Sequence, residues 1–348
     1  MKTNTLIKFV LLFAISIFSC QASAADDFDE LLAKEKKIVI AKKRIHLEDY
    51  PDAHNPSIIK VEQGYLLAFR YIPDLDFQPW VSYIGVVLLN DAFDPISTPQ
   101  LLTTRTKYSP TPSQSEDPRL FTYRGRIYVL YNDNIEIINP ATWERRDMFM
   151  AELICANNQY SLSVPIKLYY EEKYNHVMWQ KNWIPFEWNK TFLLTYMIDQ
   201  HEVIRPNLTN GACYLFKKTT NSISWEYGWL KGSSSAQLVD GEYLAFFHSG
   251  KQTISPVSWG WNLWHYFMGA YTFSAEPPFE ITKMTPTPII GEDFYTLGSY
   301  YKRVIYPGGF VASGSSIYVA YGKDDSEIWI ATLDKAEFKK ALKTVKKN

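Results

Sequence analysis

Short apolar runs alternate with polar turns along most of the chain, and one such pattern recurs five times. In each copy a polar residue precedes a short apolar run, a tight turn and a second, more apolar run that ends in another polar residue. Each copy therefore predicts two antiparallel strands joined by a hairpin turn. The copies are HNPSIIKVEQGYLLAFR (54–70), EDPRLFTYRGRIYVLYND (116–133), KNWIPFEWNKTFLLTYMID (181–199), SSSAQLVDGEYLAFFHSG (233–250) and RVIYPGGFVASGSSIYVAYGKDD (303–325).

The turns of these copies are 52 to 73 residues apart, which suits four-stranded units with variable outer loops. We therefore predict an all-β fold, a five-bladed β-propeller over residues 45–335, as one domain. A β-sandwich is the competing fold, but five similar units favour radial closure because it leaves few exposed strand edges. The predicted turn residues are Gly64, Gly125, Asn189, Gly241 and Gly314.

The N-terminus has the pattern of a secretory leader. Lys2 and Lys8 precede an apolar run over 9–18, and small residues at 22–24 offer a cleavage site. The run is shorter than the ~20 residues of a membrane-spanning helix, so no stable membrane span is expected. We predict a signal peptide over 1–24 and export to the periplasm or the exterior. A lipid anchor at Cys20 is less favoured, because the residues before it fit a lipidation box poorly.

Two short segments flank the predicted propeller. Residues 25–44 form an N-terminal segment, helical or extended. Its acidic part, residues 25–37, is predicted as a short helix outside the main fold, and the pattern of strands begins at residue 38. Residues 336–348 are predicted as a C-terminal helix or tail, since Ala336, Phe338 and Leu342 give one apolar side among many lysines. The predicted fold thus has short helices at both ends.

Composition narrows the function classes. Hydrophobic residues make up 46% and charged residues 21%, which argues for a packed core and against disorder. The net charge is −1, or −3 without the two leader lysines, so no basic excess indicates a nucleic-acid partner. Cys155 and Cys213 could pair after export or remain two buried thiols. No metal-ligand cluster, phosphate-binding glycine loop or Ser/His/Asp order stands out, so we expect no metal.

Polar residues recur where the predicted strands begin and end. In a radial fold the starts of the inner strands and the ends of the next strands open on one channel mouth. Convergent polar groups in a concavity are the default expectation for a site. The inner-strand starts supply Asn55, Glu116, Asp117, Arg119, Lys181, Asn182, Ser234, Ser235, Arg303 and Tyr306. The second strands end at Arg70, Asn132, Asp133, Asp199, His248, Lys323, Asp324 and Asp325.

These motifs resemble glycoside hydrolase family 130 over about residues 50–335. The resemblance lies in NPSI (55–58), SEDPRLF (115–121), KNWIPF (181–186), DGEYLAFFHS (240–249), YPGG (306–309) and YGKDD (321–325), in blade order. It implies a five-bladed propeller that acts on β-mannosides. Members are inverting phosphorylases or hydrolases, and a related branch contains β-mannosyltransferases.

The resemblance implies that Asp117, the Asp of the EDPR motif, is the general acid. Cleavage through an oxocarbenium-like state needs an acid on one face and a nucleophile on the other. Glu116 could keep Asp117 protonated, since neighbouring carboxylates raise each other's pKa. Alternatively, Glu116 faces into the blade, because adjacent strand residues point to opposite sides. Arg119 returns to the face of Asp117 and would orient it or a substrate hydroxyl.

The resemblance also implies two binding sets. Lys181 and His248 match positions of the family's phosphate cluster, and Arg303 or Tyr306 would add to it from the fifth blade. No cofactor is expected beyond inorganic phosphate as a co-substrate. The partner is an oligosaccharide or glycan. The predicted sugar-binding set is Asn55, Arg70, Glu116, Arg119, Asn182, Asp324 and Asp325, with a salt-bridge network as the alternative for Arg70 and Asp325.

The fourth copy departs from the family pattern. Relatives commonly open this blade with an Arg-Gly-Gly-Thr-Pro-like segment, and here residues 231–236 read KGSSSA. A lysine cannot replace the bidentate fork of an arginine. In addition, Gln180 stands before the KNW motif, where a glutamate is common. Both changes bear on phosphate use and on whether activity is retained.

Several functions remain open. Export favours hydrolysis or transfer between glycans, because a sugar phosphate made outside the cell is of little direct use. Hydrolysis needs a second carboxylate about 6.5–9.5 Å from the acid. The candidates for it are Asp199, Glu187, Asp293 and Asp325.

Two further functions differ in class. One is a β-mannosyltransferase. The other is a non-catalytic glycan-binding propeller, in which SWGWNLWH (258–265) would stack on sugars. An invertase-like furanosidase is disfavoured, because Asn55 and Pro56 stand where its nucleophilic Asp would open the first blade.

Overall fold

The computed structural model of the protein describes residues 38–76, 80–105, 112–134, 146–173, 179–220, 223–254, 261–295 and 302–345. The predicted signal peptide and the predicted helix before residue 38 lie outside these ranges. The described part consists mostly of strands, with one short α-helix. Within it, no helix is long and apolar enough to cross a membrane.

The five copies in the sequence form five β-hairpins. All five predicted turn residues have positive φ, between 46° at Asn189 and 138° at Gly64, which is the region that glycine and asparagine tolerate best. The predicted turns are therefore confirmed. The hairpins are β2 (His54–Val61) with β3 (Gly64–Tyr71), β6 (Glu116–Tyr123) with β7 (Arg126–Asp133), β11 (Ile184–Trp188) with β12 (Thr191–Met197), β16 (Gln237–Val239) with β17 (Glu242–Thr253), and β20 (Lys302–Ser313) with β21 (Ser316–Lys323).

Each hairpin extends into an antiparallel unit, and we number these units 1 to 5 along the chain. Unit 1 adds β4 (Tyr83–Leu89) and β5 (Gln100–Leu101), and unit 2 adds β8 (Asp147–Ala156), β9 (Gln159–Leu162) and β10 (Ile166–Tyr170). Unit 3 adds β13 (Glu202–Pro206) and β14 (Ala212–Lys218), after the 3₁₀ turn η1 (Glu171–Lys173). Unit 4 adds β15 (Trp229–Gly232), β18 (Leu263–Ser274) and β19 (Ile281–Met284), and unit 5 adds β22 (Glu327–Asp334) and β1 (Val39–Ile45).

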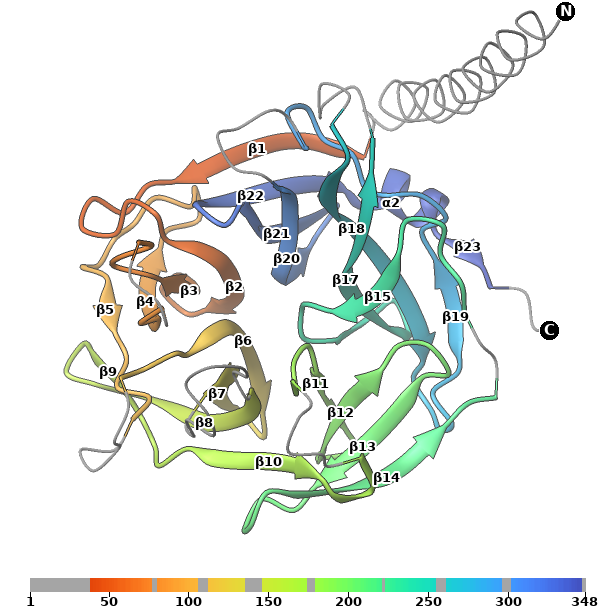
Figure 1. The fold of residues 1–348 in the computed structure, drawn as a ribbon, viewed down its shortest axis with the longest axis horizontal. Helices are drawn as coiled ribbons and strands as arrows, with labels where there is room; N and C mark the ends of the chain where they lie inside the picture. Colours follow the sequence, from red (N-terminus) through yellow and green to blue (C-terminus); the bar gives the residue numbers. More distant parts are fainter. Residues whose placement is uncertain are drawn as a thin grey trace, which may run out of the picture.

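The units surround a common centre, with the first strand of each unit innermost (Figure 1). Successive units bury apolar clusters between them, and these clusters run around the whole ring. They join Leu66 with Leu120, Leu130 with Leu194, Phe186 with Phe246 and Phe310, and Ile58 with Val311. At the hairpin-turn end of the inner strands, a pocket of about 600 Å³ is lined from β2, β6, β11, β16 and β20. The inner strands of all five units therefore converge.

Two features close the ring. β1 pairs antiparallel with β22, so the N-terminal strand completes the last unit. Residues 39–45 thus belong to the sheets, as the strand pattern from residue 38 onward predicted, and the last unit includes a strand from before residue 45. In addition, the backbones of β20 and β2 meet closely. A Cβ on Gly308 would lie 2.0 Å from the Pro56 carbonyl oxygen, which explains the glycine of the YPGG motif.

The C-terminal helix is shorter than the sequence suggested. α2 (Lys335–Ala341) begins after Asp334, whose carboxylate caps it by accepting a hydrogen bond from the Glu337 amide at 2.9 Å. Phe338 packs into the core, and β23 (Lys343–Thr344) then pairs with β19. The cysteines do not pair. Cys213 is a buried free thiol, whereas Cys155 is exposed, contrary to the expectation of two buried thiols.

Arg119 ties four of the five units together. Its guanidinium is fully buried and donates hydrogen bonds to the Asp117 and Gly232 carbonyl oxygens at 3.0 and 3.1 Å. It also donates to Asn182 Oδ1 at 3.2 Å and to the Tyr306 hydroxyl at 3.0 Å. The predicted role in substrate binding therefore does not fit a side chain that is enclosed by protein.

This arrangement predicts that Arg119→Met strongly destabilises the protein. Each buried acceptor left without its donor costs about 1–3 kcal/mol, so we expect a loss of at least about 3 kcal/mol in the free energy of unfolding. Chemical denaturation measures it. Arg126→Met is the matched control, because that side chain is largely exposed and pairs with Glu152. Equal stability of the two variants would contradict the role of Arg119.

Candidate functional site

Three inner strands open with the same backbone conformation. Asn55, Asp117 and Asn182 follow the polar residues His54, Glu116 and Lys181, and have φ of 46°, 53° and 65°. Asparagine and aspartate are the non-glycine residues that enter this region most readily. β2 and β6 also contain a β-bulge directly after these positions. A bulge interrupts the alternation of side chains between the two faces of a strand. Two consecutive side chains can then both lie toward the centre of the ring.

Asp117 lies at the inner end of β6 and is 9% exposed. Asn55 Nδ2 donates a hydrogen bond to its Oδ1 at 2.9 Å, and Arg70 Nη1 lies 3.8 Å from the same oxygen. Unit 1 thus holds the carboxyl group of Asp117 from one side. The predicted proximity of Asn55, Arg70 and Asp117 is present in the structure.

Glu116 is buried among three cations. Its carboxylate lies 2.7 Å from Arg70 Nη2, 3.0 Å from Arg146 Nη2 and 2.7 Å from Lys181 Nζ. Burial alone would raise the pKa of Glu116, but Arg70, Lys181 and Arg146 outweigh it and hold this pKa well below its usual range. Glu116 is therefore ionised and fixes the cations of three units. Its carboxylate is enclosed by these cations at 4% exposure, so its predicted roles beside Asp117 and in sugar binding stay predictions.

His54 connects Asp117 with the end of β21. The ring is buried, and its Nδ1 donates a hydrogen bond to the Asp52 carbonyl at 2.8 Å. Burial and then Arg70 lower its pKa, while Asp325 and Asp117 oppose this. Both carboxylates therefore lie within electrostatic reach of one imidazole. Asp325 is the candidate second carboxylate that the structure associates with this end of the ring.

Residues 231–236, where the sequence departs from the family pattern, contain a break in the inner strand of unit 4. β15 ends at Gly232 and β16 begins at Gln237, and the amides of Ser233 and Ser234 both donate to the Phe246 carbonyl. Ser233 Oγ lies 2.6 Å from His248 Nδ1. The His248 ring lies 5.1 Å from that of Tyr306, so two of the four residues predicted for phosphate are in contact.

Lysines gather next to His248. Burial, followed by the charges of Lys181 and Lys302, lowers the pKa of Lys231. Burial, then Lys231, Arg119 and Lys181, lowers that of His248 well below its usual value, so the ring is neutral at pH 7. A pocket of about 260 Å³ opens here, lined by Lys181, Asn182 and Lys231 together with Trp179, Tyr196 and Met197. We call it the lysine pocket; Arg119 links Asn182 on its wall to the Asp117 backbone.

Several predicted residues serve the fold instead. Asp324 accepts a hydrogen bond from the Val304 amide at 2.9 Å, and Arg303 is buried next to His265 between β18 and β20. Neither reaches the lysine pocket. Asp133 is enclosed by Arg105 at 2.8 Å, Ser115 at 2.8 Å and the Gln114 amide.

Three of the four candidate bases lie elsewhere. Glu187 accepts from the Arg124 amide at the hairpin-turn end, and Asp293 pairs with Lys42 of the outermost strand. Asp199 accepts from the Ile223 amide.

Sequence patterns missed Arg146, Ser82 and Lys302. Arg146 precedes β8, and Ser82 accepts a hydrogen bond from Arg70 Nε at 3.0 Å while donating to the Ser115 carbonyl. Lys302 lies 5.9 Å from the Tyr266 ring, as Lys231 does. None of these residues belongs to a recurring motif. Among the described residues, no group of three or more His, Cys, Asp or Glu could hold a metal ion.

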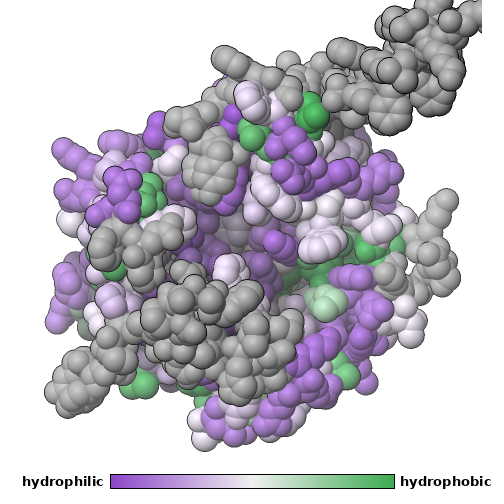
Figure 2. All heavy atoms as spheres, viewed as in Figure 1, coloured by the Kyte–Doolittle hydropathy of each residue, from purple (hydrophilic) through white to green (hydrophobic). Residues whose placement is uncertain are grey.

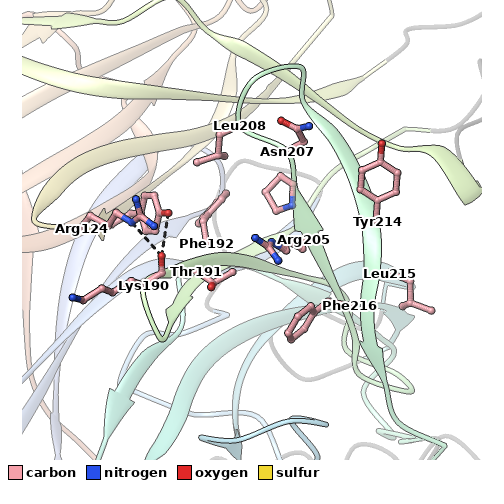
Figure 3. Close-up of a pocket in the computed structure, with 12 residues that line it drawn as sticks. Arg124, Lys190, Thr191, Phe192, Arg205, Asn207, Leu208, Tyr214, Leu215 and Phe216 are labelled. Carbon is pink, nitrogen blue, oxygen red and sulfur yellow. Dashed lines mark hydrogen bonds between the residues drawn. The ribbon is translucent and has the colours of Figure 1, made fainter.

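The surface agrees with this location. The face in Figure 2 is hollowed near its centre, and hydrophilic side chains surround the hollow. A separate pocket of about 600 Å³ lies between units 2 and 3, where Arg124, Lys190, Arg205 and Tyr214 surround it (Figure 3). It contains none of the predicted site residues. The candidate site is therefore the central end of the inner strands.

The Glu116 cluster predicts a specific pH dependence. Because the folded pKa of Glu116 is depressed, its contribution to stability is complete above the ordinary pKa of about 4.3 and is lost as pH falls below that value. We expect Glu116→Gln to be less stable at pH 7 and to lose less of its remaining stability between about pH 5 and pH 3 than the native protein. Thermal unfolding across this range measures both. Glu152→Gln, at a partly exposed ion pair, should keep the native dependence of stability on pH. An unchanged pH dependence for Glu116→Gln would refute the assignment.

No protein-family model matches the sequence, and no curated protein matches it either. Solved structures match over most of the chain. One is reported for the GH130 family of mannoside phosphorylases, which contains glycoside hydrolases that target β-1,2-mannosidic linkages in Candida mannan. It is 13% identical, with a TM-score of 0.59, and the match covers 85% of this chain and 90% of that chain.

Two further structures carry bound molecules. The β-1,2-mannobiose phosphorylase from Listeria innocua, solved with β-1,2-mannobiose, is 14% identical with a TM-score of 0.57, covering 89% of this chain and 95% of that chain. The mannose phosphorylase MPT-4 from Leishmania mexicana, solved with phosphate, is 11% identical with a TM-score of 0.59, covering 94% and 98%. The chain thus shares its fold with GH130 mannoside phosphorylases and glycoside hydrolases, as its motifs predicted.

Proposed function

We propose that this protein is a five-bladed β-propeller enzyme that cleaves β-linked mannosides with inversion, and that Asp117 is its general acid. The five units supply the blades, and β1 closes the last one. Support for the substrate comes from the shared fold, since the Listeria protein was solved with β-1,2-mannobiose. Export through residues 1–24 is part of the proposal and rests on the sequence alone.

The observation that carries the proposal is the setting of the Asp117 carboxyl group. Within the described part of the chain, its hydrogen bond and its near ion pair both involve Oδ1. A proton on Oδ2 can then pass to the departing sugar oxygen, directly or through a sugar hydroxyl. Asn55 fixes the orientation of the group, so that the proton is presented in one direction.

The lysine pocket favours phosphate as the attacking group. Lys181 and Lys231 line it, and the charges of Lys181 and Lys302 both act on Lys231, so a dianion beside Lys231 would relieve this repulsion. It would also favour the protonated, donating form of His248. In the reaction, a phosphate oxygen bonds to the sugar C1 as the glycosidic C1–O bond breaks, and Asp117 protonates the leaving oxygen. The products are α-mannose 1-phosphate and the shortened glycan.

Hydrolysis is the second candidate, with Asp325 as the second carboxylate. This carboxylate acts on His54 together with Asp117. An inverting hydrolase needs such a second carboxylate to take a proton from water. An exported enzyme would also gain more from free mannose than from a sugar phosphate. Incubation with β-1,2- and β-1,4-mannobiose, with and without phosphate, distinguishes the two by the product formed.

We predict that Asp117→Asn lowers kcat/KM for the cleaved mannobiose by about 10²–10⁴, because a general acid typically contributes that much. Substrate binding should persist, since the amide keeps the shape of the carboxyl group. Initial rates and calorimetric binding measure the two effects. Asp293→Asn, at the outer strand, should behave as the native enzyme. Native-like turnover by Asp117→Asn would remove Asp117 from the role of acid.

We also predict that Lys231→Gln raises the KM for phosphate at least about tenfold and changes the KM for mannobiose little. The reason is the loss of one charge-assisted contact to the dianion. Steady-state kinetics with phosphate varied test this. Lys339→Gln is the matched control, because Lys339 is exposed and pairs with Asp240 away from this pocket. Equal phosphate KM values for the two variants would leave hydrolysis as the supported reaction.

A further inference from the structure

A long groove adjoins the lysine pocket on unit 4. It encloses about 940 Å³, and Met197, Leu230 and Lys231 line both cavities. The groove runs over β15, β17 and β18, away from the centre of the ring. The groove and the lysine pocket therefore share a wall on unit 4.

The groove floor is one face of the unit 4 sheet. Lys231 pairs with His248 across β15 and β17, and the next row outward pairs Trp229 with Gly250. Gly250 also pairs with Tyr266 of β18, and Gln252 pairs with Trp264. Alternate residues of a strand share a face, so these rows follow one another about 7 Å apart. The rows lead from His248 to the tryptophans.

The tryptophan side chains of these rows are exposed above the part of β17 where Gly250 has no side chain. Trp229 is 83% exposed and Trp264 is 43% exposed, which is unusual for the largest apolar side chain. Gly250 leaves room between them. A Cβ there would come within 3.5 Å of the Tyr266 ring and 3.7 Å of the Trp264 ring. Among the described residues, the rings of Trp229, Trp264 and Tyr266 border this groove around Gly250, which has no side chain.

Polar groups accompany the rings. Gln252, Lys231 and the Asp199 carboxylate line the same groove. Flat aromatic faces beside hydroxyl-binding amides and charges suit a neutral sugar, whose C–H face is apolar and whose edge is polar. A peptide would require the apolar contacts to be continuous, and here charged and amide groups interrupt them.

We infer that this groove binds the further sugar units of an oligosaccharide whose terminal unit is cleaved at Asp117. The inference rests on the proposed function for the reaction, and on the groove itself for binding. It makes a glycan chain, rather than a disaccharide, the preferred substrate. Trp229 and Trp264 are the stacking platforms, and Gln252 binds hydroxyl groups beside them.

Binding by chain length tests this inference. In the Asp117→Asn background, calorimetry measures the Kd of β-1,2- and β-1,4-linked manno-oligosaccharides of two to six units. We expect affinity to rise with length, and Trp229→Ala and Trp264→Ala to weaken binding of the longer chains at least about tenfold, with mannobiose unaffected. Tyr214→Ala is the control, because this exposed strand aromatic belongs to the separate pocket in Figure 3. Thermal unfolding verifies that each variant is folded.

The possible outcomes test glycan binding in the groove separately from the proposed reaction. Length-dependent binding that needs Trp229 and Trp264 supports the groove, even if no mannoside is cleaved. Cleavage of mannobiose together with length-independent affinity overturns the groove and leaves the proposed reaction standing. Longer chains that bind the tryptophan variants as tightly as the Tyr214→Ala variant also overturn it.

Discussion

The buried charges at the inner ends of the first strands hold this structure together. Arg119 donates to four units, and Glu116 gathers cations from three. Removing a charge from water is costly, so such groups need hydrogen-bond or ion-pair partners. The ring must therefore close for Arg119 and Glu116 to meet these partners. Closure of the ring thus brings the residues of the candidate site together.

At the inner ends of these strands, the backbone conformation determines which side chains reach the candidate site. Positive φ at Asn55, Asp117 and Asn182, with the bulges in β2 and β6, interrupts ordinary strand alternation. Consequently Glu116 serves the cation cluster while its neighbour Asp117 is held by Asn55. The acid is thus placed by backbone geometry and by amide contacts, and the adjacent carboxylate stabilises its surroundings. In the fourth unit, the inner strand is instead interrupted at Ser233 and Ser234.

The hairpins, their turns and the convergence of Asn55, Arg70 and Asp117 could be predicted from the sequence, because local patterns encode them. Long-range partners could not. Arg146 reaches Glu116 from outside any motif, and β1 completes a unit that lies almost 300 residues further along the chain. Asp324 and Arg303 showed the right residue types at the right strand ends, yet their side chains bind the fold. The position of a residue in a motif predicts which end of the ring it lies at. The direction of its side chain depends on bulges and packing, which a single sequence does not reveal.

The central claim is an inverting cleavage of β-mannosides at Asp117. Proton and phosphorus NMR of the first product released from β-linked mannobiose, recorded before mutarotation, tests it most directly. The account predicts an α-configured product, α-mannose 1-phosphate with phosphate or α-mannose with water. A β-configured first product would contradict inversion, and the absence of any product from either linkage would contradict the proposed enzyme.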